Sequence, residues 1–132
     1  MNTAEFSSEQ IMKYLFTTGA VGTRPTNWYV GLHTGDPTLD GSANEAAYTG
    51  YARQSADFTA DQPVVNGSWR ARNDADVTFP PTDAAVTVTY VTVFDAVTGG
   101  NCLAVLQLPL SRTVASGGVF SIPANELVLT GE

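Results

Sequence analysis

The chain has 132 residues, of which 43% are hydrophobic and only 14% charged, and its formal net charge is −7. This length predicts one domain with a core that needs no metal, and a single cysteine excludes an intrachain disulfide. The negative charge disfavours nucleic acid and anionic membranes as partners, because both repel an acidic surface. The sequence shows neither a signal peptide nor an apolar run of membrane-spanning length, so we expect a soluble protein made in the cytoplasm.

Residues 6–19 predict the one α-helix of the chain. Ser7 and Gln10 have the spacing of a capping box at the start of this helix. Apolar residues recur at helical spacing and predict a stripe buried against the rest of the protein, formed by Ile11, Met12, Leu15 and Phe16. Two roles stay open for such a helix: it caps an open end of a sheet, or it is an arm that docks on another subunit.

From residue 25 onward, short apolar runs alternate with turn residues, as in successive β-strands. The run 27–34 predicts a strand with His33 facing outward, and both tryptophans, Trp28 and Trp69, are expected to face inward. The segment 86–94 contains only β-branched and aromatic residues and predicts a central strand, followed by a turn at Gly99–Gly100 and a partner strand from Cys102. Other strands are predicted at 51–58, 64–72, 75–79, 111–114, 119–122 and 126–130.

These patterns predict an all-β fold, namely a two-sheet β-sandwich or jelly-roll-like domain with one short N-terminal α-helix. We expect a single domain over residues 1–132. Within it, residues 1–24 form a helical N-terminal arm or cap and residues 25–132 form the β domain.

The chain offers few residues for catalysis or metal binding. Cys102 and His33 are the only cysteine and histidine, and a nucleophilic pair would need an exposed thiol and a third orienting residue. The long loop 35–50 places Asp36 and Asp40 at calcium-loop spacing, but Ala47 stands where such a loop needs a bidentate glutamate. We therefore predict a non-enzymatic protein without a cofactor or a metal site, in which this loop is a solvated turn.

Four segments after the helix carry a family resemblance: WYVGLHTGDP (28–37), GYARQ (50–54), VTFP (77–80) and FDAVTGGN (94–101). They resemble small virion structural proteins of tailed bacteriophages, a family whose members are labelled tail-fibre or head-decoration proteins. The resemblance implies a rigid β domain located in the virion, which makes contacts through the N-terminal helix, the 35–50 loop and exposed tyrosines. The candidate interface residues are Phe6, Tyr14, Tyr29, Asp36, Asp40, Glu45, Tyr48, Tyr51 and Arg53.

Our leading functional hypothesis is a capsid decoration (cement) protein that clamps neighbouring major-capsid subunits and stabilises the head. The expected partners are the major capsid protein and copies of the chain itself, as a dimer or trimer, with no nucleic acid, membrane or small-molecule substrate. The alternative is a tail-fibre or baseplate protein, or an adhesin for a host receptor. A third hypothesis, a carbohydrate-binding module, requires an exposed coplanar aromatic pair built from Trp28, Trp69 or Tyr51.

Overall fold

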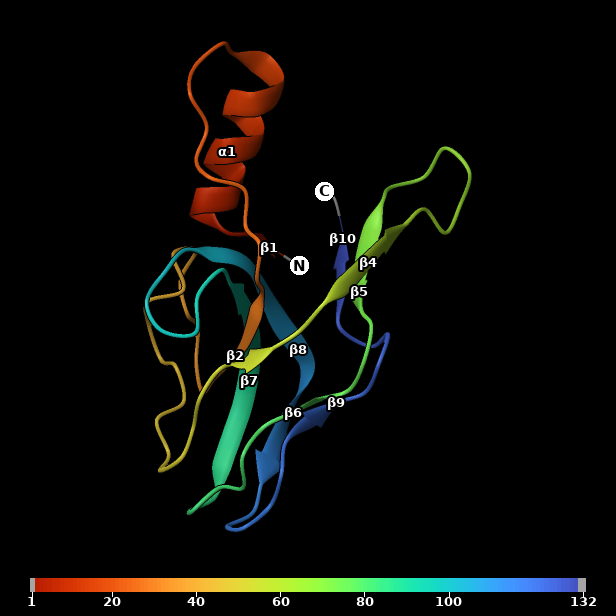
Figure 1. Cartoon of the computed structure of the whole chain (residues 1–132). Helices are drawn as coiled ribbons and strands as arrows, with labels where there is room; N and C mark the ends of the chain where they lie inside the picture. The colour runs from red at the N-terminus through yellow and green to blue at the C-terminus, as the bar shows by residue number, and fades with distance from the viewer. Residues whose placement is uncertain (1, 131–132) are drawn as a thin grey trace.

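The computed structural model describes residues 2–130 and contains three antiparallel sheets with one helix at the N-terminal end (Figure 1). The elements are β1 (Asn2–Thr3), α1 (Glu5–Phe16), β2 (Tyr29–His33), β3 (Gln54–Ser55), β4 (Phe58–Asp61), β5 (Arg70–Asn73), β6 (Val77–Thr78), β7 (Val86–Phe94), β8 (Cys102–Val114), β9 (Ser121–Ile122) and β10 (Val128–Thr130). The largest sheet has the order β1-β8-β7-β2-β3, the second β10-β5-β4, and the third pairs β6 with β9. The predicted fold class, all-β with one N-terminal helix, is confirmed, and no sheet closes into a barrel over residues 2–130.

The hairpin of β7 and β8 organises the largest sheet. Strand β7 covers the predicted segment and lies between β8 and β2, which confirms that it is central. Gly99 and Gly100 adopt positive φ values of 59° and 72° in the turn between the strands, a conformation that glycine adopts without steric cost. The carboxylate of Asp95 closes this turn by accepting a hydrogen bond of 2.7 Å from the backbone N–H of Asn101.

The main core fills the space between the largest sheet and the two smaller ones. Buried residues of β2 and β7 meet Val77 of β6 and Ile122 of β9 there. Phe79 lies at the centre with 1% of its surface exposed, and its ring centroid is 6.1 Å from that of Phe120 and 6.3 Å from that of Tyr51. The layer facing the largest sheet is thus divided into two small sheets.

A second, smaller core cluster contains Ala4, Phe94, Cys102 and Val105. Gly41 of the 35–50 loop lies against it with a φ of +72°, and a Cβ atom at this position would stand 2.8 Å from Cys102 and from Phe94. The absence of a side chain at residue 41 therefore allows the loop to approach the sheet closely.

Substitution Gly41→Ala is expected to lower the free energy of unfolding by about 2–4 kcal/mol, since backbone strain and overpacking act together. Gly50→Ala is the matched control, because Gly50 also has a positive φ, of +86°, but nothing lies within 4 Å of the added Cβ. Urea denaturation of both variants tests the prediction. Equal losses in the two variants would show that the contact with Cys102 and Phe94 contributes nothing.

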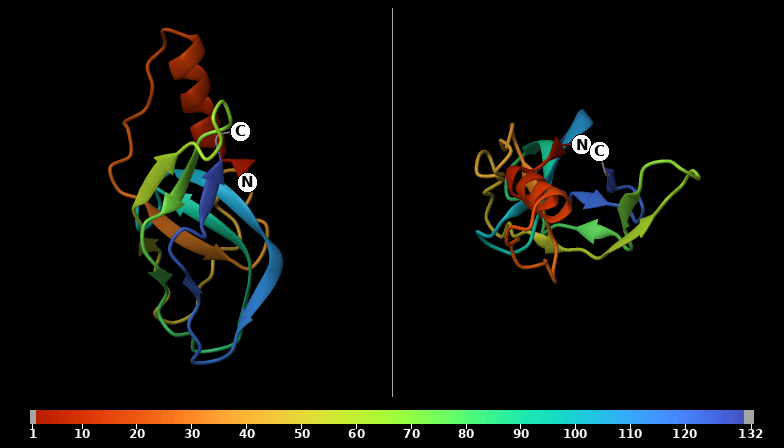
Figure 2. Two further views of the ribbon diagram at one scale, coloured as in Figure 1. Left: turned by 90° about the vertical axis from the view of Figure 1, so that its right-hand side faces the viewer. Right: turned by 90° about the horizontal axis from the view of Figure 1, so that it is seen from above.

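Helix α1 differs from the prediction in its ends and in its burial. It runs from Glu5 to Phe16, its N-cap residue is Ala4, and no side chain caps it. The hydroxyl of Ser7 instead donates a hydrogen bond of 2.7 Å to the carbonyl oxygen of Leu103, so the predicted capping box is absent. None of the helix residues is buried, and the predicted buried stripe is wrong, because α1 projects beyond the end of the sheet (Figures 1 and 2).

Two side chains of the β region also lie on the opposite side from that predicted. His33 is fully buried, because the 35–50 loop covers the face of β2 that was expected to meet solvent. Trp69 is 59% exposed, because the predicted strand 64–72 begins only at Arg70 and the preceding residues form a protruding hairpin connection. The predicted strand 51–58 is likewise interrupted, with pairing only at Gln54–Ser55 before β4 begins.

Candidate functional site

The second half of α1 exposes five large apolar side chains. The exposed fractions of these side chains are far too large for a buried stripe: 49% for Ile11, 55% for Met12, 74% for Tyr14, 61% for Leu15 and 72% for Phe16. Within residues 2–130, no side chain of α1 is buried, although Leu103 of β8 and the segment 21–25 lie beside the helix. Contiguous exposed apolar residues of this size are typical of protein–protein contact sites.

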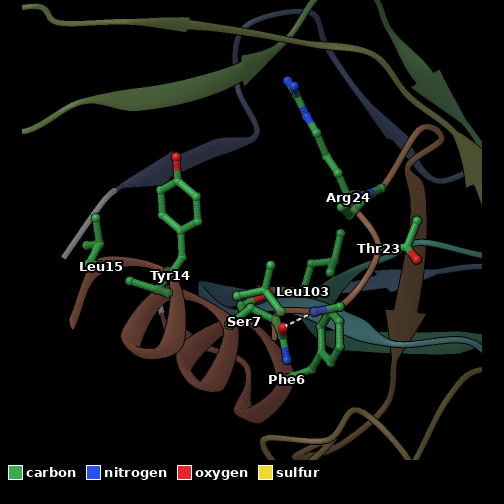
Figure 3. A pocket seen from close by; sticks show the side chains of 12 residues that line it. Phe6, Ser7, Tyr14, Leu15, Thr23, Arg24 and Leu103 are labelled. Carbon is green, nitrogen blue, oxygen red and sulfur yellow. Dashed lines mark hydrogen bonds between the residues drawn. The ribbon is translucent and has the colours of Figure 1, made fainter. Parts of the chain in front are cut away.

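A groove of about 770 Å³ runs between α1 and the returning segment 21–25. Phe6, Ile11 and Tyr14 line it from the helix, and Leu103 of β8 lies between the two sides. The backbone N–H of Gly22 donates a hydrogen bond to the side-chain oxygen of Gln10, which ties the returning segment to α1. Figure 3 shows Tyr14 and Arg24 on opposite sides of the groove, both extending away from Leu103.

The connection between β4 and β5 exposes a second apolar group. Val64, Val65 and Trp69 are 66%, 84% and 59% exposed, and the chain turns between them at Asn66 with a φ of 63°. Figures 1 and 2 show that this hairpin and α1 reach the same end of the molecule, where the hairpin extends to one side and the two elements lie apart. We call the exposed apolar side chains at this end the apical surface; they are Ile11, Met12, Tyr14, Leu15, Phe16, Val64, Val65 and Trp69.

An interior polar cluster joins the 35–50 loop to the β7–β8 turn. The guanidinium of Arg53 donates two hydrogen bonds to Glu45, from Nε at 2.8 Å and from Nη2 at 2.9 Å. Nη1 of Arg53 donates to the carbonyl oxygens of Ala96 and Gly99 at 3.0 and 2.8 Å. The guanidinium also lies 3.5 Å from the ring centroid of Phe94, so one side chain holds two loops and a strand together.

The protonation states in this cluster follow from burial and from hydrogen bonding. Burial raises the pKa of Glu45, but the hydrogen bonds from Arg53 and Tyr51 outweigh it, and the pKa lies below its usual value. Burial raises the pKa of Tyr51, so its hydroxyl stays protonated and donates a hydrogen bond of 2.7 Å to Glu45. The cluster is therefore an ion pair whose charged groups all have hydrogen-bond partners, and such a pair holds the segments that carry it together.

The buried His33 ring is held in one neutral form. Nδ1 lies 2.9 Å from the carbonyl oxygen of Ala43, which only accepts, so Nδ1 carries the proton. Nε2 lies 2.9 Å from the hydroxyl of Thr92 and accepts from it. Burial lowers the pKa of His33 below its usual value of 6.5; the hydrogen bond with Ala43 and the charge of Glu45 raise it by less, and the charge of Arg53 lowers it further.

The pKa of His33 makes the stability of the protein depend on pH. Because the unfolded chain binds the proton more readily, the free energy of unfolding is highest above about pH 6.5 and falls as pH decreases toward the folded-state pKa. Urea denaturation at about pH 7.5 and about pH 5.5, where most carboxylates stay ionised, measures the effect. His33→Gln should remove this dependence, since His33 is the only histidine; an unchanged pH profile in the variant would contradict the assignment.

Hydrogen bonds among its own polar groups hold the conformation of the 35–50 loop. Asp36 Oδ1 accepts from the backbone N–H of Thr38 at 2.9 Å, and Asp40 Oδ1 accepts from the N–H and hydroxyl of Ser42. The hydrogen bond from Thr38, followed by those from Ser42, lowers the pKa of Asp40 to about 2. No group of three or more metal-ligating side chains occurs in the part of the chain that the structure describes.

The candidate interface residues divide between these regions. Tyr14 lies on the apical surface and Phe6 in its groove, while Asp36 and Asp40 are exposed on the loop. The structure brings Glu45, Tyr51 and Arg53 together in the interior polar cluster, where Arg53 is only 9% exposed. Tyr29 and Tyr48 are half-buried, and the Tyr48 hydroxyl donates to the carbonyl oxygen of Pro80 at 2.7 Å.

Sequence reasoning missed most of the apical surface. Leu15 and Phe16 were assigned to the core, although the alternative of a docking arm describes their observed position. The signal available in the sequence was the second half of α1, where every residue from Ile11 to Phe16 except Lys13 is apolar or aromatic.

The structure also bears on the catalytic and carbohydrate-binding hypotheses. Cys102 is buried in the second core cluster, where burial raises the pKa of its thiol to about 11. Both ring nitrogens of His33 form hydrogen bonds, with Ala43 and with Thr92. Among residues 2–130 the paired rings belong to Tyr48, Tyr51, Phe79 and Phe120, and neither tryptophan takes part. The one described helix lacks the length and hydropathy needed to span a membrane.

Comparison with known proteins assigns the family. The model of the family described as "Podophage GP4 fiber I protein gp80" matches residues 2–130. Among curated proteins no sequence matches the chain. The family match confirms a non-enzymatic virion component, and its description names a fibre, which was the alternative hypothesis, rather than a head decoration. The chain therefore belongs to this family of podophage fibre proteins and is a structural protein of the phage virion.

Proposed function

We propose that this chain is a building block of the podophage tail fibre and acts by binding other virion proteins and copies of itself, as a dimer or trimer. One structural observation carries the proposal: a rigid β body presents a projecting helix none of whose side chains is buried. Such a helix is stable in water mainly when a partner covers its apolar face. The family description supplies the fibre context.

Contacts within the β body fix its longest loop and the start of α1. Arg53 and Glu45 clamp the longest loop to the β7–β8 turn, and the second core cluster holds the base of α1 through Ala4. The backbone N–H of Glu5 donates to the carbonyl oxygen of Leu39 at 2.9 Å, which fixes the start of the helix on the same loop. These contacts give the helix a defined direction relative to the sheets.

Immunogold labelling of intact virions tests the location. Antibodies against the chain are expected to label the fibres at the tail. Label distributed over the head surface would overturn the proposal and support capsid decoration, with the major capsid protein as the partner. Particles lacking the protein provide the matched control: we expect them to retain DNA on heating as wild-type particles do, and to adsorb less well to cells.

A further inference from the structure

We propose that the apical surface is the self-association surface of this protein, occupied by the apical surface of a second copy. The inference rests on the proposed function for the expectation that the chain assembles, and it adds the surface and the occupant. Three independent features of the described residues support it: the exposed apolar area, the distribution of charge, and the geometry of α1.

The exposed area matches what a specific interface requires. Tyr14, Phe16 and Trp69 are 74%, 72% and 59% exposed. Since an aromatic side chain buries about 150–250 Å², these three offer roughly 300–500 Å². With the five aliphatic side chains of the apical surface, the total is on the order of 500–900 Å², and a standard interface buries about 800 Å² per partner. The apical surface is thus large enough for a stable contact between two copies.

The charge distribution favours contact between identical chains at this end of the molecule. Two copies with a formal charge of −7 each repel one another. The segments that form the apical end, residues 5–26 and 58–73, hold three acidic and four basic residues, a formal charge of +1. Contact at this end therefore keeps the acidic parts of both copies away from the interface.

The acidic groups nearest the apical surface are already neutralised within the chain. Glu9 pairs with Lys13 one helical turn away on α1. Asp61 of β4 pairs with Arg70 at 2.8 Å and with Arg72 at 3.1 Å on β5. A second copy can therefore cover this surface without isolating an unpaired carboxylate.

The geometry of α1 suits pairing with the same helix of another copy. Ile11 and Leu15 are separated by four residues, as are Met12 and Phe16, and such rows form the ridges with which helices pack. The connection between β4 and β5 reaches the same end of the molecule as α1 and lies to one side of the helix (Figures 1 and 2). An end-to-end approach lets both elements take part, and a contact that uses the same surface on both copies closes on itself.

Sedimentation velocity of the purified full chain tests the inference. The wild-type protein is expected to sediment as a dimer at about 100 µM. Leu15→Glu on α1 and Trp69→Glu on the hairpin should each weaken association about tenfold or more, because a charge replaces a side chain that the contact buries. Leu110→Glu is the matched control, since Leu110 is 78% exposed on β8, outside the apical surface, and should leave association unchanged.

Circular dichroism separates assembly from folding in these variants. None of the three replaced side chains is buried, so all three variants should keep the wild-type spectrum. A wild-type chain that stays monomeric, or an equal loss of association in Leu15→Glu and Leu110→Glu, would overturn the inference. Should Leu15→Glu lose structure, Trp69→Glu alone decides between the two results. Fibre labelling in virions together with a monomer in solution would leave the proposed location standing and assign the apical surface to another virion protein.

Discussion

Replacing Arg53 by alanine is expected to lower the free energy of unfolding by about 3 kcal/mol, because it leaves a charged partner without compensation. The Glu45 side chain is 26% exposed, which places the loss toward the lower end of the range for buried pairs. The substitution also removes the donors to Ala96 and Gly99 and the contact with the Phe94 ring. Urea denaturation of the purified variant measures the change.

Two further variants separate charge from geometry at this position. Arg53→Lys keeps a positive charge but lacks the planar fork that reaches Glu45 with two nitrogens, so we expect a loss of about 1–2 kcal/mol. Arg24→Ala removes an exposed guanidinium at the edge of the apical groove and should change the free energy of unfolding by less than about 0.5 kcal/mol. A loss in Arg53→Ala no larger than that in Arg24→Ala would refute the clamp.

Phe79→Ala should cost about 3–5 kcal/mol of unfolding free energy, since it opens a cavity in the main core. Phe79 is 1% exposed and contacts the rings of Tyr51 and Phe120. Thermal and urea denaturation at a concentration where the chain is monomeric measure this loss without a contribution from association.

The same substitution at an exposed phenylalanine is the control for the core prediction. Phe16 is 72% exposed at the end of α1, and Phe16→Ala is expected to change the unfolding free energy of the monomer by less than about 0.5 kcal/mol. A small effect of Phe79→Ala would mean that the core closes around the lost ring, whereas a large effect of Phe16→Ala would mean that α1 packs on the protein in solution.

The central hairpin shows what local sequence is able to predict. The bounds of β7 and its central position follow from nine consecutive β-branched or aromatic residues, because this composition suits a strand covered on both faces. The turn at Gly99 and Gly100 follows from the ease with which glycine adopts positive φ. Both predictions concern backbone preferences, which depend on residues only a few positions apart in the sequence.

The candidate site shows where this reasoning stops. Alternation along β2 places His33 on the face opposite Val30, but whether that face meets solvent depends on the 35–50 loop, which covers it. Arg53 was predicted to lie at the surface because it is charged, but in the structure Glu45 pairs with its charge and the side chain is buried. In each case a segment distant along the chain changed the surroundings of the side chain.

Helix α1 combines both situations. Its existence and its apolar residues were evident from spacing alone, since the 3.6-residue period is a local property of the chain. The sequence by itself thus determined the helix, the central hairpin and the mostly β character of the molecule. Only the tertiary structure decided that α1 projects past the sheet edge with its apolar face uncovered, because burial depends on how the elements meet in space and local periodicity carries no information about that arrangement.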